Sequence, residues 1–203
     1  MNSVKKQEVV LKDLPHNNLT RLLSYQRVPK LGKNDLYNRA YGAMVGFLIG
    51  DSMGSYLINK PFSQSQIAEA VMMRGGGAMG LKGGQGTDEW EICVALSEGL
   101  IEGKGNYDNN IIAQKYLNWL ESNPSDLPVL VGVAFSSIRQ QKQKRGVVFS
   151  RKKLGSQLLE NSLKNLKQYS NLGLVRIIPL VIWGIHLDEC QFNQLIKGIS
   201  SYI

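Results

Sequence analysis

The chain has 203 residues, a formal net charge of +8 at pH 7 and a hydrophobic share of 43%. This length is enough to bury a hydrophobic core and corresponds to one domain, with or without an appendage. The charged share of 20% and the aromatic share of 8% exclude an intrinsically disordered protein. The positive charge is compatible with a polyanionic partner but does not require one.

Cysteine usage and the apolar segments limit the compartment. Cys93 and Cys190 lie far apart, with no C-x-x-C spacing and no Cys/His cluster, so neither a zinc site nor a disulfide framework is indicated. The N-terminal residues lack the apolar region of a signal peptide. The longest apolar run, residues 40–50, is too short to span a bilayer. We therefore expect an intracellular protein without a membrane partner, located in the cytoplasm, with the nucleus as the alternative.

The first 35 residues differ from the rest of the chain. Residues 1–35 are polar and basic, contain Pro15 and Pro29, and show no sustained hydrophobic periodicity. This pattern predicts an extended, partly disordered leader. We expect the folded domain to occupy residues 36–203.

Helical periodicity begins near Asn38 and includes a regular series of glycines. Gly42, Gly46, Gly50 and Gly54 recur every four residues, which places them on one face of a helix. Glycine inside a helix costs roughly 1 kcal/mol relative to alanine, so a compensating contact is expected. The glycine face predicts close packing against another helix, which would bring Asp51 to a crowded position.

The remainder of the chain predicts further helices and no sheet. Helical spacing of apolar residues is found in five segments, and strand-type alternation is nowhere sustained. The predicted fold class is therefore all-α. The predicted helices cover residues 87–102, 110–122, 126–139, 154–168 and 177–186.

Two irregular segments were considered as ligand sites. Residues 61–86 contain the glycine groups Gly75–Gly77 and Gly83–Gly86, whose free backbone N–H groups could hold a phosphate before a helix N-terminus. No G-K-[ST] follows, so this is not a P-loop. Residues 139–153 include seven basic side chains with a single aromatic one. A solvated loop explains that segment better than a nucleic-acid surface, and a nucleic-acid partner is not expected.

Thr87, Asp88 and Glu89 form the most informative triplet of the chain. A threonine followed by two acids is typical of a helix N-terminus, where the hydroxyl caps the helix and the acids complement its dipole. The same three residues supply hard oxygen ligands of the kind that Mg²⁺ prefers. The residues alone leave both interpretations open, with capping the more frequent one.

Four motifs follow one another along residues 39–197 and together resemble a known family. They are GAMVGFLIGDSMG at 42–54, MRGGG at 73–77 with GQGTDE at 84–89, YLNWLESNPSD at 116–126, and NLGLVRIIP at 171–179. In this order they resemble the ADP-ribosylglycohydrolase family, relatives of the enzyme that removes ADP-ribose from dinitrogenase reductase.

The resemblance implies a helical bundle and a chemistry. Members of the family are expected to use two Mg²⁺ ions to hydrolyse the N- or O-glycosidic bond between ADP-ribose and a protein side chain or small acceptor. The resemblance carries the metal ligands onto Thr87, Asp88 and Glu89, with Asp88 and Glu89 as catalytic residues. It places the substrate-binding residues at Asn171 and Gly173, with Gly75, Gly76 and Gly77 bordering the site.

Several positions depart from the family pattern. Glu89 stands where the family has aspartate, Leu172 where it has glycine, and Ile58 where it often has a carboxylate. No D-x-D motif is present, which predicts a domain that is truncated at its C-terminus and lacks half of the ligands of a two-metal centre.

Two hypotheses therefore remain. The chain is either an ADP-ribosylglycohydrolase that acts on an ADP-ribosylated protein, or a catalytically inactive relative. The inactive relative would bind ADP-ribose, or a protein partner that covers the apolar face exposed by the truncation.

Overall fold

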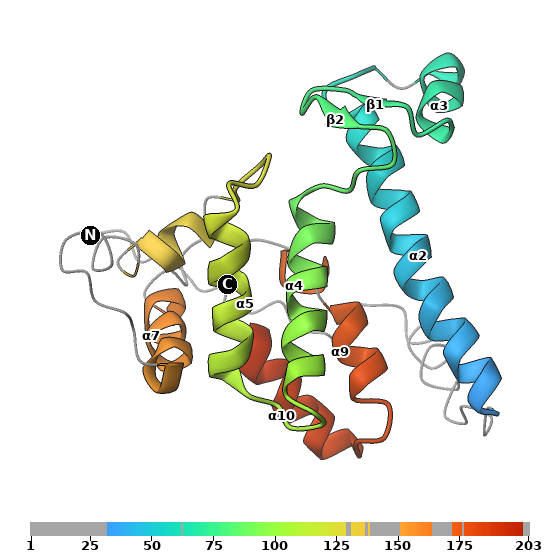
Figure 1. Ribbon diagram of the computed structural model, residues 1–203. Coiled ribbons are helices and arrows are strands. Elements are labelled where there is room, and N and C mark those ends of the chain that lie inside the picture. Colours follow the sequence, from blue (N-terminus) through green and yellow to red (C-terminus); the bar gives the residue numbers. More distant parts are fainter. Residues whose placement is uncertain are drawn as a thin grey trace, which may run out of the picture. The chain divides into compact units, whose positions relative to one another are not determined.

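The computed structural model describes residues 32–61, 63–128, 131–136, 138, 151–163, 172–175 and 177–200. Most of these residues are helical, and the sheet they contain is a single two-stranded one (Figure 1). This confirms the all-α class predicted from the sequence. The elements are α2 Lys33–Leu57, α3 Gln64–Val71, β1 Gly75–Gly76, β2 Leu81–Lys82, α4 Asp88–Glu102, α5 Asn109–Glu121, α7 Arg151–Leu163, α8 Leu172–Val175, α9 Ile177–Trp183 and α10 Glu189–Ser200.

The chain divides into two units, Met1–Arg39 and Ala40–Ile203, and α2 crosses the division. The hydrophobic core, the candidate site and every element from α3 onward lie in the second unit. None of the helices described combines the length and hydropathy that crossing a bilayer requires.

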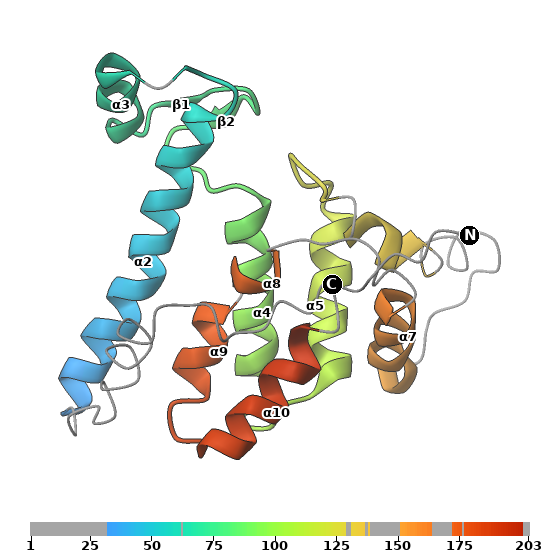
Figure 2. The same ribbon diagram turned by 180° about the vertical axis from the view of Figure 1, so that it is seen from behind.

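The core is built around α4, which packs beside α5 in both views of the structure (Figures 1 and 2). Ile92, Leu96 and Leu100 recur along one face of α4 and are almost fully buried. They are joined by apolar side chains of α5, of the helical residues 131–136 and 138, of α7 and of α9. The 3.6-residue period of α4 therefore translates directly into a buried stripe.

The close approach of α4 and α5 depends on Gly99. A Cβ atom at this position would lie 2.9 Å from Cγ1 and 3.1 Å from Cα of Ile112. The second of these atoms belongs to the backbone of α5, so it cannot move aside as a flexible side chain would. A glycine is thus required where the two helices cross.

The predicted helix bounds agree with the structure for α4 and α5 and differ elsewhere. The helix α7 begins at Arg151, three residues before the prediction, and residues 164–168 of the predicted segment lie outside the described part. The helix α9 ends at Trp183 rather than at His186, because the chain turns at Gly184. The predicted helix 126–139 is wrong at its start, since residues 126–128 are not helical. The sequence analysis missed α3, the short helix α8, α10 and the two-stranded sheet.

The glycine face of α2 does not pack as predicted. A Cβ atom placed at Gly42, Gly46, Gly50 or Gly54 would meet no atom within 4 Å. The prediction of a close helix contact at this face is therefore wrong for the part of the chain that the structure describes. The neighbouring Ile49 side chain is likewise 41% exposed.

The contrast between Gly46 and Gly99 gives a direct test of the packing. Gly46→Ala should raise the free energy of unfolding by about 0.5–1 kcal/mol, since alanine is the better helix former and meets open space. Gly99→Ala should lower it by about 1–3 kcal/mol, because the methyl group overpacks the α4–α5 crossing. Urea unfolding of the two variants measures both changes. Destabilisation by Gly46→Ala would contradict an open glycine face.

Candidate functional site

The candidate site lies where the C-terminal part of α2 meets the N-terminus of α4. Asp51 of α2 accepts two hydrogen bonds from Thr87: one from its backbone N at 2.6 Å and one from Oγ1 at 2.7 Å. Hydrogen bonds to a charged carboxylate are among the stronger ones in proteins. This pair therefore fixes the start of α4 against α2.

Thr87 is the N-cap of α4. Its backbone is extended, and its Oγ1 accepts a hydrogen bond of 3.2 Å from the backbone N of Glu89. The capping interpretation of the triplet is confirmed by this geometry. The hydroxyl group of Thr87 also meets Oε2 of Glu89, so it lies between two carboxylates.

The carboxylates of this site are poorly compensated. Asp88 is buried, with 4% of its surface exposed, and no Lys, Arg or His of the described chain forms an ion pair with Asp51, Asp88 or Glu89. Burial raises the pKa of Asp88 to about 7, and the charge and hydrogen bond of Glu89 add to the effect. Burial also raises the pKa of Asp51, although the hydrogen bonds from Thr87 oppose the shift.

The side chains at this site are oxygen ligands of the kind that a hard divalent cation prefers. They are fewer than such a cation needs for a complete set of ligands. Within the described residues, no three side chains of His, Cys, Asp or Glu converge as a ready-made metal site. Mg²⁺, however, is commonly held by one or two carboxylates, with water and substrate phosphate as its other ligands. Thr87, Asp88 and Glu89 meet that smaller requirement, and Asp51 adds a fourth nearby oxygen donor. Their role as metal ligands remains a prediction.

The glycine loop lies against α2, close to this cluster. Gly75 pairs with Lys82, and Gly76 pairs with Leu81. Gly75, Gly76 and Gly77 have φ angles of +80°, +84° and +70°, a region that favours glycine. A Cβ atom at Gly77 would lie 2.9 Å from the carbonyl oxygen of Ser55, one helical turn beyond Asp51. The loop thus packs against α2 one turn beyond Asp51, and its place beside a bound substrate remains a prediction.

The other predicted substrate residues are placed less completely. Gly173 lies in α8, which contacts α4. Asn171 lies outside the described residues. The structure therefore brings one of these two residues to the neighbourhood of α4 and leaves the other untested.

Two contributors were absent from the predicted site. Asp51 is the direct partner of Thr87, and its sequence signal was the G-D-x-x-G motif at the end of the glycine helix. Trp90 is the second: its ring lies 6.0 Å from that of Phe47, centroid to centroid, in a tilted arrangement. A Cβ atom at Gly86 would meet Cβ of Trp90 at 2.6 Å, so only glycine fits before the cap.

The fold and the site together define an all-α class of protein with buried carboxylates at a threonine-capped helix junction. The chain belongs to the ADP-ribosylglycohydrolase family, because the sequence model of that family matches residues 32–198. The predicted resemblance is thereby confirmed.

Curated relatives support the same assignment. The chain is 36% identical over 97 residues to an ADP-ribosyl glycohydrolase of Acanthamoeba polyphaga mimivirus. The matched segment covers 44% of this chain and 28% of that protein. It is 34% identical over 96 residues to the ADP-ribosyl-dinitrogen reductase glycohydrolase of Rhodospirillum rubrum, and this match covers 45% of this chain and 32% of that protein. It is 30% identical over 87 residues to the ADP-ribosylarginine hydrolase Tri1 of Serratia proteamaculans, and this match covers 43% of this chain and 23% of that protein. The matched segments thus span less than a third of each relative for the first two and less than a quarter for the third.

The raised pKa of Asp88 predicts a pH-dependent stability. The folded protein keeps the proton of Asp88 up to a pH of about 7, whereas an aspartate in an unfolded chain loses it near pH ~3.9. Asp88 therefore costs stability increasingly as the pH rises from about 4 to 7, and the cost is constant above that range. Asp88→Asn should gain stability over the wild type across this window, by at most about 4 kcal/mol at pH 8.

Urea unfolding at several pH values measures this difference, with the exposed Glu189→Gln on α10 as the control. A difference between Asp88→Asn and wild type that does not change between pH 4 and pH 8 would contradict a buried, protonated Asp88.

The double role of Thr87 predicts a graded effect of substitution. Thr87→Ala should lower the free energy of unfolding by about 1–2 kcal/mol, because it removes the cap of α4 and one hydrogen bond to Asp51. Thr87→Ser keeps both functions and should stay within about 0.5 kcal/mol of the wild type. Thermal unfolding of the two variants at neutral pH provides the measurement. Equal losses of stability in Thr87→Ala and Thr87→Ser would contradict a stabilising role of the hydroxyl group.

Proposed function

We propose that this chain is an ADP-ribosylglycohydrolase, which hydrolyses the N- or O-glycosidic bond between ADP-ribose and a protein side chain or small acceptor. The observation that carries the proposal is the Asp51–Thr87 link, which holds Asp88 and Glu89 at the start of α4 in a member of this family. The names of the three relatives support it, since two are ADP-ribosyl glycohydrolases by name and the third is named an ADP-ribosylarginine hydrolase.

The described side chains have distinct roles in this proposal. Asp51 is a positioning residue, because it fixes Thr87 and with it the direction of the first turn of α4. Asp88 is the candidate general base: burial raises its pKa to about 7 in the site without a cation, and a bound cation would keep the carboxylate ionised. Glu89 is half-buried, with its Oε2 on the hydroxyl group of Thr87, so it can orient the same reacting centre.

The proposed cofactor is Mg²⁺, held by Thr87, Asp88 and Glu89. When bound, the cation would supply Lewis-acid and orienting chemistry at the ribose. The backbone of Gly75–Gly77 lies close enough to the cluster to border a bound substrate, because Gly77 packs on α2 one turn beyond Asp51. Gly173 in α8 approaches α4 from another segment and is the second proposed substrate contact.

Release of ADP-ribose tests the proposal. The wild type should release ADP-ribose from a protein that carries it on arginine, and the rate should rise with added Mg²⁺. Asp88→Ala should lower the rate by about 10²–10⁴-fold, the usual contribution of a general acid or base. Asp51→Asn should lower it less, since the backbone N–H of Thr87 can still donate to the amide oxygen.

Glu189→Gln, which lies on the exposed side of α10, is the matched control and should keep the wild-type rate. Release by Asp88→Ala at the wild-type rate would contradict the proposal. If the wild type releases no ADP-ribose and yet binds free ADP-ribose in a calorimetric titration, the chain is instead the inactive binding relative.

Metal binding can be tested without turnover. Mg²⁺ should raise the melting temperature of the wild type at pH 8 and do so less at pH 5.5, because a protonated Asp88 competes with the cation. Asp88→Asn should lose most of this stabilisation, whereas Glu189→Gln should keep it. A rise in melting temperature that is equal in all three proteins would place the cation elsewhere.

A further inference from the structure

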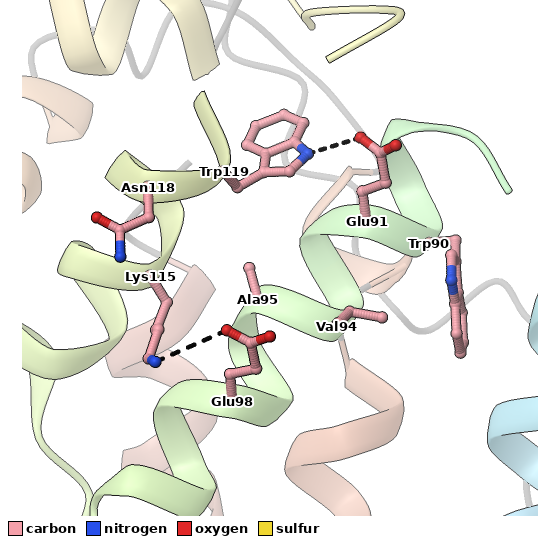
Figure 3. A pocket seen from close by; sticks show the side chains of 8 residues that line it. All are labelled: Trp90, Glu91, Val94, Ala95, Glu98, Lys115, Asn118 and Trp119. Atoms are coloured by element: carbon pink, nitrogen blue, oxygen red, sulfur yellow. Dashed lines mark hydrogen bonds and ion pairs between the residues drawn. The ribbon is translucent and has the colours of Figure 1, made fainter. Parts of the chain in front are cut away.

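A second candidate site lies in a groove between α4 and α5. Its volume is about 370 Å³, and it is separate from the hydrogen bonds that join α2 to α4. Figure 3 shows that two links cross it, one near each end. At one end Nε1 of Trp119 donates a hydrogen bond of 2.7 Å to Oε2 of Glu91. At the other, Nζ of Lys115 lies 3.7 Å from Oε2 of Glu98.

Between these links the groove has an apolar lining. Val94 and Ala95 lie on the α4 side between the two links, and the ring of Trp119, which is 9% exposed, bounds one end (Figure 3). An aliphatic or planar side chain could lie on this apolar surface of α4. The α4 side of the groove is therefore apolar along its middle with a carboxylate at each end, and Asn118 adds a polar side chain from α5.

The charges along the groove do not balance. Lys115 is shared, because its Nζ is 2.9 Å from Oε2 of Glu102 and only 3.7 Å from Oε2 of Glu98. Glu91 has a neutral partner, the indole of Trp119, and it forms no ion pair with any cation in the part of the chain described. The lining of the groove thus contains two carboxylates, Glu91 and Glu98, and one lysine, which leaves a net negative charge in a protein whose overall charge is +8.

A complementary ligand can be deduced from this lining. It should carry a positive charge that reaches Glu91 or Glu98, and a flat or aliphatic body that covers Val94 and Ala95. A guanidinium group meets both requirements, since it binds carboxylates through a planar fork and stacks on aromatic rings. The indole of Trp119 adds an attractive surface for a cation.

We propose that the α4–α5 groove binds an arginine side chain of a polypeptide partner. The binding does not depend on the proposed hydrolase activity. Together with that activity, it would place the polypeptide part of a substrate beside the carboxylate cluster, because Glu91 lies one helical turn after Asp88 on α4.

The test uses a hexa-arginine peptide as the probe and the side-chain indole N–H signals of the ¹⁵N-labelled protein as the readout. Addition of the peptide should shift the signal of Trp119, whose N–H donates to Glu91, and leave that of Trp183 in α9 unchanged. A hexa-citrulline peptide has the same shape without the charge and should produce no shift. Equal shifts of Trp119 with both peptides, or equal shifts of Trp119 and Trp183, would overturn the proposal.

Three substitutions in the groove should change the affinity for the peptide, two by weakening it and one by strengthening it. Glu91→Gln and Glu98→Gln should each weaken peptide binding by roughly three- to tenfold, the size expected for one partly exposed carboxylate contact. Glu91→Gln keeps an oxygen acceptor for the indole of Trp119, so the helix pair should remain intact. Lys115→Gln should strengthen binding, because it removes the competing cation from Glu98.

Matched controls separate a local site from a general effect of charge. Glu189→Gln and Lys104→Gln change the net charge by the same amount at exposed positions outside the groove. Both should bind the peptide as the wild type does. If Glu189→Gln weakens binding as much as Glu98→Gln, or Lys104→Gln strengthens it as much as Lys115→Gln, the groove is not the binding site. These outcomes do not involve ADP-ribose, so they are independent of the activity assay.

Discussion

The two hydrogen bonds from Thr87 to Asp51 are the interaction on which the site depends. They connect residues 36 positions apart in the chain, and they join α2 to the helix around which the core is built. The glycine face of α2 meets open space among the described residues, so the glycines contribute nothing to this junction. The junction instead relies on the Asp51–Thr87 bonds, on the contact of Phe47 with Trp90 and on the packing of Gly77 against Ser55.

The same junction gathers negative charge that the described side chains do not neutralise. The N-terminus of α4 compensates part of it, because the helix dipole and the free N–H groups of its first turn favour anions. Burial, and after it the charge of Glu89, still raises the pKa of both Asp51 and Asp88. A proton can relieve the remaining repulsion, and so can a cation. Helix capping and cation binding are therefore two consequences of one arrangement of Thr87, Asp88 and Glu89.

Local sequence patterns were sufficient to predict α4 and α5 but not the long-range contacts. Their bounds followed from apolar spacing and, for α4, from the capping residue Thr87, which acts within a few residues of the chain. The cap of α5 is Asp108, which the sequence analysis did not name. The glycine face of α2 was misjudged because a pattern on one helix does not specify what lies opposite. Asp51 was missed as a site residue for the same reason, since its role depends on a partner 36 residues away. The α4–α5 groove could not be predicted at all, because Glu91 meets Trp119, and Glu98 meets Lys115, only when the two helices pack.

The position of Glu89 also has a physical explanation in this structure. The hydroxyl group of Thr87 carries one proton, yet it lies between Asp51 and Glu89. It can donate to one of the two carboxylates at a time, so the other carboxylate needs a different partner, which water or a cation can supply. The longer side chain of glutamate is what allows residue 89 to reach back to the hydroxyl group while its backbone N is bound by the cap. Glutamate at position 89 thus keeps a second carboxylate at the hydroxyl group of Thr87.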